Sequence, residues 1–153
     1  MRIKILVLII ITFMAIFSWR FLQPVKIITV HANENHSVFD IVVKYPPLTN
    51  QAKIKWWDDN MMILREKYDV PVDEKNYSVY FWASDYKADS GTDQDNDLLC
   101  FDDIESDKKC ISKDNQPMTI WYLKNKNETI YLLNQWENKY IKDNKTGAIE
   151  KIR

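Results

Sequence analysis

The stretch TNQAKIKWWDDNMMILREKYDVP, residues 49–71, is the part of the sequence that decides the fold class. Its apolar residues recur at spacings of three and four, which places them on one stripe of an α-helix; they are Ile54, Trp57, Met61, Leu64 and Tyr68. Thr49 is typical of a helix N-cap, and Pro71 forbids continuation of the helix. The pattern therefore predicts one amphipathic helix that packs its stripe on another element.

Predicted strands lie on both sides of this helix. Residues 25–30 and 38–45 are rich in β-branched and aromatic side chains and are separated by a polar turn, which indicates a hairpin. After the helix, similar composition marks residues 77–84, 98–101, 118–124, 129–134, 139–142 and 148–152. Short polar turns between neighbours favour antiparallel pairing. We expect an α+β fold, with the helix packed on one face of a mainly antiparallel sheet.

A hydrophobic segment precedes the first strand. Residues 5–19 carry no charge, Arg2 and Lys4 come before them, and Arg20 follows. A cleavable signal peptide needs small residues at the cut, a lipoprotein needs a Cys after the apolar run, and a buried helix is seldom apolar on every face; none of these fits. We therefore expect residues 1–23 to be an uncleaved signal-anchor transmembrane helix that contacts the inner membrane through residues 5–22.

The remaining chain, residues 24–153, is long enough for one core and is expected to form a single periplasmic domain. A slight excess of positive charge before the hydrophobic segment favours the N-terminus inside and this domain outside. The domain holds 18 basic and 22 acidic residues, because three of the 21 Lys and Arg lie in the first 23 residues. A net charge of −4 makes nucleic acid an unsuitable partner, since phosphate backbones require a basic face.

Two cysteines, Cys100 and Cys110, indicate the redox compartment. Their spacing matches no redox motif, and two Cys with two distant His make no metal site. We predict a structural disulfide, which suits an exported domain and would not persist in a reducing cytosol.

The acidic stretch from Asp85 to Asp107 is the strongest charge signal. It carries nine acidic residues and one Lys before Lys108, a net charge of −8. Three readings are open: a solvated loop, a calcium site built on the Asp-x-Asp-x-Asp pattern, or a face for a basic protein partner. The calcium pattern lacks the Gly that an EF-hand loop requires, because Leu98 stands there. The candidate partner-binding residues are Asp89, Asp93, Asp95, Asp97 and, on the predicted helix, Trp56.

No catalytic constellation is evident. There is no Gly-x-Ser-x-Gly elbow, and only two glycines are available for loops that cradle phosphates. We expect no enzymatic activity, no cofactor and no metal. Trp56 has an alternative reading as a core residue under a neighbouring strand.

Several short phrases together resemble the enterobacterial membrane proteins grouped as domain of unknown function 943. The resemblance spans the hydrophobic segment to about residue 120. Its more specific parts are Lys53-Ile54-Lys55-Trp56-Trp57 and the pair Cys100-Phe101-Asp102-Asp103 and Cys110-Ile111. The resemblance implies a single-span envelope protein without assigned catalytic residues. It also implies genes that often lie near toxin loci.

These observations lead to two functional hypotheses. The first is a membrane-tethered periplasmic binding protein, specifically an immunity protein that neutralises an envelope-acting toxin. The partner that it binds would be a basic toxin or effector domain. The alternative is an accessory subunit of an envelope membrane assembly, which contacts other membrane proteins through the hydrophobic segment.

Overall fold

The computed structural model describes residues 2–71, 74–89, 91 and 97–152. Seven strands form the main sheet, in the order β1-β2-β3-β6-β7-β8-β9. Their bounds are β1 Lys26–Ala32, β2 Val38–Lys44, β3 Tyr77–Trp82, β6 Met118–Leu123, β7 Glu128–Leu133, β8 Asn138–Asp143 and β9 Ile149–Ile152. Neighbouring strands pair antiparallel except β2 and β3, which are parallel because helix α2 (Asn50–Tyr68) carries the chain back across the sheet between them.

Helix α2 begins and ends as the sequence predicts. The Thr49 side chain accepts a hydrogen bond from the Ala52 N–H, and Asp69 ends the helix in a left-handed conformation with φ of 58°. Ile54, Trp57 and Leu64 are buried against the sheet, and Met61 and Tyr68 pack partly on the same cluster. The predicted apolar stripe is therefore confirmed, and burial of each large apolar side chain contributes about 1.5–3 kcal/mol.

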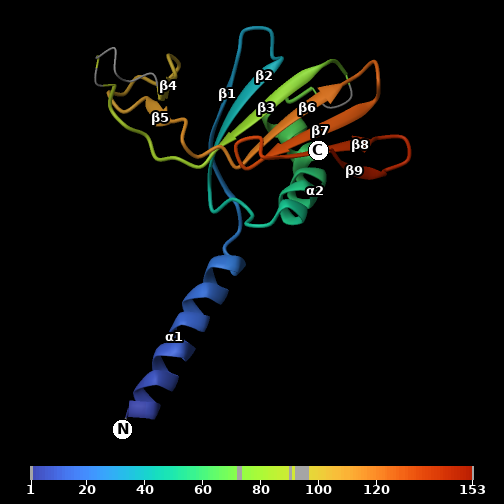
Figure 1. Cartoon of the computed structure of the whole chain (residues 1–153). Coiled ribbons are helices and arrows are strands. Elements are labelled where there is room, and N and C mark those ends of the chain that lie inside the picture. Colours follow the sequence, from blue (N-terminus) through green and yellow to red (C-terminus); the bar gives the residue numbers. More distant parts are fainter. Residues whose placement is uncertain (1, 72–73, 90, 92–96, 153) are drawn as a thin grey trace.

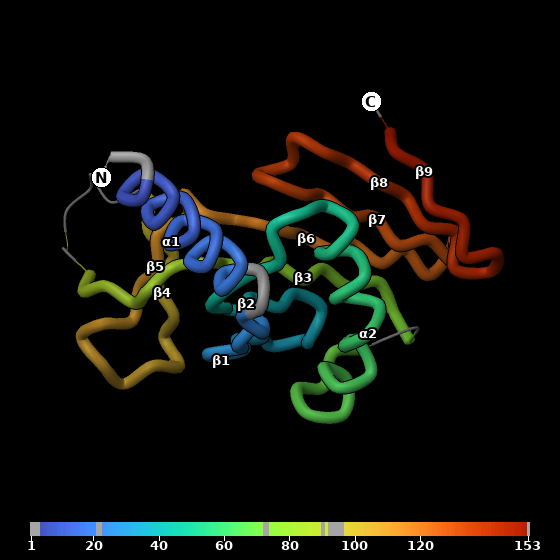
Figure 2. Tube along the Cα trace, turned by 90° about the horizontal axis from the view of Figure 1, so that it is seen from below, coloured from blue at the N-terminus to red at the C-terminus, as the bar shows by residue number. Residues whose placement is uncertain are grey.

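The opposite face of the sheet carries a smaller cluster. Along β2 and β3, Val42 and Trp82 alternate with the residues that face α2, so their side chains point to the other side. Phe101 and Ile111 cover them. These two residues belong to the described part of residues 83–116, which we call the β4–β5 lobe after its strands β4 (Leu98–Cys100) and β5 (Cys110–Ser112). Figure 2 shows the lobe and α2 on opposite sides of the molecule.

Helix α1 (Arg2–Leu22) projects away from the sheet (Figure 1). Its large apolar side chains between Ile5 and Trp19 are exposed. No helix within the described residues has both the length and the hydropathy needed to cross a bilayer. Lys4 and Arg20 limit the uncharged run to 15 residues, about 22 Å at 1.5 Å per residue, whereas the hydrocarbon core is about 30 Å thick. The structure therefore does not support the predicted transmembrane span over residues 1–23.

The expected fold class is confirmed: the chain is α+β with a mainly antiparallel sheet and an amphipathic helix packed on one face. Each predicted strand is present within two residues of its expected bounds. Strand β5 was not predicted, because its three residues lie in a polar stretch that gives no alternation to read.

Candidate binding surfaces

The predicted partner-binding residues do not form one surface. Trp56 lies on α2, half-buried, with its ring edge-on to Phe81 at 5.6 Å between centroids. Asp89 and Asp97 are exposed on the β4–β5 lobe, on the other side of the molecule. Asp93 and Asp95 lie outside the described residues. A single partner face would therefore use either the tryptophan or the acidic residues.

Exposed carboxylates gather on the lobe. Besides Asp89 and Asp97, the described acidic residues Asp102, Glu105 and Asp107 are exposed. Asp102 has one distant cation contact, with Lys109 at 3.5 Å, and its side chain remains fully exposed. Exposed pairs of this kind contribute little stability, so the lobe keeps its negative charge available to a partner.

A disulfide joins Cys100 and Cys110 across the last pair of the β4–β5 ladder, next to the loop that connects the two strands. The Asp89 carboxylate lies near the two sulfur atoms, all within 4.8 Å of one another. Sulfur atoms in a disulfide are not thiolates and bind metal ions poorly, so these three residues do not make a metal site while the bond is intact. The bond closes the loop between β4 and β5.

Polar contacts around His31 tie the lobe to strand β1. The imidazole is buried and stacks on Phe101, with ring centroids 3.7 Å apart. Its Nδ1 lies 2.7 Å from the Asp103 carboxylate, and its Nε2 lies 2.8 Å from the Tyr86 hydroxyl, which also contacts Thr29. Burial raises the pKa of Tyr86, so its hydroxyl stays protonated. Phe101 covers the His31 ring. The stacking and the polar contacts of His31 together hold strand β1 against the β4–β5 lobe.

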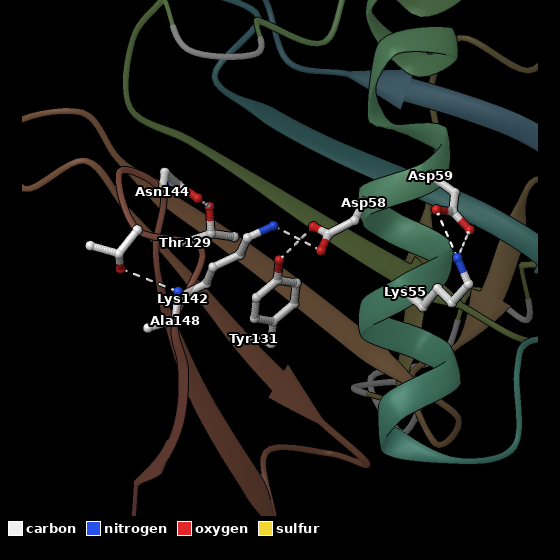
Figure 3. A network of polar contacts seen from close by, with 9 residues as sticks. Lys55, Asp58, Asp59, Thr129, Tyr131, Lys142, Asn144 and Ala148 are labelled. Carbon is white, nitrogen blue, oxygen red and sulfur yellow. Dashed lines mark hydrogen bonds and ion pairs between the residues drawn. The ribbon is translucent and has the colours of Figure 1, made fainter.

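A second polar network lies on the helix face of the sheet (Figure 3). The Asp58 carboxylate on α2 accepts a hydrogen bond from the Tyr131 hydroxyl at 2.9 Å and from Lys142 Nζ at 2.8 Å. Tyr131 is fully buried on β7, and burial together with the Asp58 charge raises the pKa of its phenol well above the ordinary value. The three side chains fix the angle of α2 across β7 and β8.

A groove of about 570 Å³ opens beside this network, between α2 and the β8–β9 hairpin. Asp58, Lys55 and Asp59 line it from the helix, and Tyr140 and Lys151 line it from the hairpin. Strand β9 is the edge of the sheet, and all four of its residues are exposed. An edge strand can pair with a partner strand, although Lys151 on this edge opposes uncontrolled pairing.

Sequence reasoning did not find the two networks. Asp58, Tyr131 and Lys142 come from three elements separated by many residues, and neither their spacing nor their residue types mark them as a group. The sequence marks His31 only as one of two distant histidines that make no metal site, and its partner Asp103 only as one of nine acidic residues. Only the three-dimensional structure brings these residues together.

Comparison with known proteins gives one match. The sequence model of a family described as enterobacterial putative membrane protein (DUF943) matches residues 1–153. No curated protein and no solved structure matches the chain. The match extends the resemblance beyond residue 120 to the whole sequence, including the β7–β9 region. The chain therefore belongs to this family of enterobacterial putative membrane proteins.

Proposed function

We propose that this protein is a membrane-tethered binding protein of the periplasm, and specifically an immunity protein that neutralises an envelope-acting toxin. The observation that carries the proposal is helix α1, which exposes apolar side chains along residues 5–19 and projects from a folded domain (Figure 1). Such a helix is stable in a bilayer and unfavourable in water, since its large apolar side chains are exposed.

The tether must accommodate a short apolar run. A hydrophobic segment shorter than the bilayer is tolerated when the membrane thins locally and flanking Lys and Arg side chains extend toward the headgroups. Lys4 and Arg20 flank the run at its two ends. In this arrangement α1 remains uncleaved as a signal anchor in the inner membrane, and residues 24–153 lie in the periplasm.

The disulfide supports the periplasmic side. Cys100 and Cys110 are paired, and structural disulfides persist in oxidising compartments. A domain held in the cytosol would keep these thiols reduced and would lose the closure of the β4–β5 lobe.

The lobe is the surface that meets the toxin in this proposal. Its exposed carboxylates attract a basic protein over several ångströms and raise the association rate. The family resemblance, with genes that often lie near toxin loci, supports a toxin as that partner. No catalytic step is required, because neutralisation by binding needs only a complementary surface.

A protection assay tests the proposal. A sensitive strain expressing the full chain is challenged with the toxin encoded beside the gene, and survival is compared with that of a strain carrying the empty vector. We expect protection, together with recovery of the toxin in a pull-down. Equal killing of the two strains combined with no captured toxin would refute the immunity role.

An accessory subunit of an envelope assembly is the second candidate, because the exposed apolar faces of α1 could also pack on the helix of another membrane protein. Replacing residues 1–22 with an unrelated anchor separates the two functions. An immunity protein keeps its protective activity after the exchange, whereas a subunit that assembles through α1 loses its place in the complex.

A further inference from the structure

Lys53 is a buried cation without an anionic partner among the described residues. The residue is 4% exposed, and its Nζ donates a hydrogen bond to Oδ1 of Asn134. Asn134 in turn donates to Oδ1 of Asn50 at 3.1 Å, so Lys53 contacts neutral amides. Buried ammonium groups are normally paired with a carboxylate, because desolvation of an unpaired charge is costly. Burial lowers the pKa of Lys53 for the same reason.

Lys53 lies in the wall of a cavity. Lys53 lines a small cavity together with the apolar residues Val43, Phe81 and Met118. The same residue lines a cavity of about 420 Å³ that is also lined by Arg20, the last charged residue of α1. Arg20 donates one hydrogen bond to the Pro46 carbonyl at 3.3 Å and lies over the Tyr45 ring, 5.6 Å from its centroid; its other guanidinium N–H groups have no hydrogen-bond partner among the described residues.

Amide side chains complete the cavity wall. Asn115, Asn134 and Gln135 line it, and Glu137 is its one acidic lining residue. Lys53 and Arg20 carry two positive charges and Glu137 carries one negative charge, so the described lining has a net charge of +1. An anion with a single charge would neutralise it.

The β7–β8 turn holds Asn134 in an unusual conformation. Asn134, Gln135 and Trp136 all have positive φ, at 54°, 54° and 71°, although none is glycine. Two backbone hydrogen bonds of 3.1 Å, from Asn134 to the Pro117 carbonyl and from Gln135 to the Gln116 carbonyl, fix the turn against the cavity. Strain of this kind persists only where surrounding contacts impose it, and it clusters at ligand sites. The turn holds the side-chain amide of Asn134 where its Oδ1 accepts the hydrogen bond from the Lys53 ammonium.

We propose that this cavity binds a phosphate group and that its occupant is the headgroup of an anionic membrane lipid. The Lys53 ammonium and the Arg20 guanidinium are donors that suit phosphate oxygens, and the amides supply further N–H groups. The choice of a lipid rests on the proposed function, since Arg20 ends the apolar run of α1 and so brings the cavity to the membrane surface. The phosphate then supplies the anion that Lys53 lacks.

Thermal unfolding of the full chain in neutral detergent micelles tests the site. Two probes are added at constant ionic strength: inorganic phosphate, and phosphatidylglycerol mixed into the micelles, with phosphatidylcholine as the neutral comparison. Lys53→Met removes the buried charge at similar volume. Lys55→Met is the matched control, because it removes one charge from the same helix outside this cavity.

We expect phosphatidylglycerol to raise the melting temperature of the wild type and of Lys55→Met. Lys53→Met should bind the lipid about tenfold more weakly, since a charge-assisted hydrogen bond is lost. A third variant, Glu137→Gln, should bind more tightly, because a repelling carboxylate is removed. This variant retains Lys53, so it tests the site even where Lys53→Met is unstable.

Three results would overturn the proposal. If neither probe stabilises the wild type, or if the two lysine variants lose affinity equally, the cavity does not bind phosphate. If inorganic phosphate stabilises the protein and the anionic lipid does not, the lipid headgroup is the wrong occupant. Membrane attachment is measured separately, by alkaline extraction of cell membranes, so failure of the tether is distinguished from failure of the phosphate site in micelles.

Discussion

The two faces of the main sheet are held by different forces. On the α2 face, a large apolar core surrounds Trp57, and polar contacts join the helix to the sheet side at Asp58 and at Lys53. On the lobe face, the apolar cluster is small, the His31 contacts join the lobe to β1, and a disulfide holds β4 to β5 within the lobe. Apolar burial gives the first face its stability, whereas the second relies on a covalent bond and on directed polar contacts. The comparison indicates that the acidic lobe can change its sequence and charge without disturbing the fold.

The largest difference between the faces should appear in the core under α2. Trp57→Ala should lower the free energy of unfolding by about 3–5 kcal/mol, because the indole is 1% exposed and its removal leaves a cavity. Urea unfolding of the full chain in mild detergent, followed by far-UV circular dichroism, measures this loss. Met62→Ala on the exposed side of the same helix is the control and should change stability by less than about 0.5 kcal/mol. Similar losses in the two variants would contradict the assignment of the core.

The lobe should respond to loss of its disulfide. Replacing Cys100 and Cys110 with Ser opens a loop of ten-residue separation and should cost about 2.5–3 kcal/mol in the chain-entropy model. Structural damage should stay local: amide hydrogen exchange should accelerate more in β5 than in β3 and β6, which lie in the core of the sheet and should follow only the loss of global stability. Equal acceleration in the three strands, beyond that global loss, would show that the lobe supports the whole fold. Alkylation of the unreduced, denatured protein from cells should label neither thiol, and two labelled thiols would overturn both the bridge and the periplasmic location.

Tyr131→Phe tests the network under α2 and should have a smaller effect. At neutral pH, loss of the hydrogen bond to Asp58 should cost about 1 kcal/mol. The raised pKa of Tyr131 adds a pH dependence: the unfolded phenol ionises near its ordinary pKa of 10.0, while the folded phenol keeps its proton. The wild type should therefore lose stability as the pH rises above 10, and Tyr131→Phe should lose less. Tyr45→Phe, at an exposed tyrosine, is the control and should follow the wild type.

The sequence predicts the α2 face well and the lobe face poorly, for a physical reason. Helical and strand periodicities report which residues face an apolar core, so Ile54, Trp57 and Leu64 could be identified before the structure was known. The sequence of the lobe shows little hydrophobic periodicity. Its folded structure depends on contacts between residues distant in the sequence, such as His31 with Asp103. Lys53 shows the same limit, because nothing in its neighbours along the chain indicates that a charged residue of an amphipathic helix lies inside the protein. The sequence identifies the hydrophobic segment and the charges at its ends, but the predicted span requires a bilayer to accommodate a run shorter than its hydrocarbon core, and no helix within the described residues is long and apolar enough to cross it.

The smallest effect on stability should come from the exposed acids of the lobe, and it is the change that tests their role. Asp89→Asn with Asp97→Asn should leave the free energy of unfolding within about 0.5 kcal/mol of the wild type, because both side chains are exposed.

If the lobe steers a basic toxin, the same variant should associate with the toxin more slowly, with little change in the dissociation rate. Added salt should slow wild-type association through screening and should slow the variant less. Glu34→Gln with Glu66→Gln removes the same charge from exposed sites outside the lobe and should leave association nearly unchanged. Equal association rates for all three proteins at low salt would show that the acidic lobe is a solvated surface, and the partner would then have to bind elsewhere, for example at the groove beside α2 and β9.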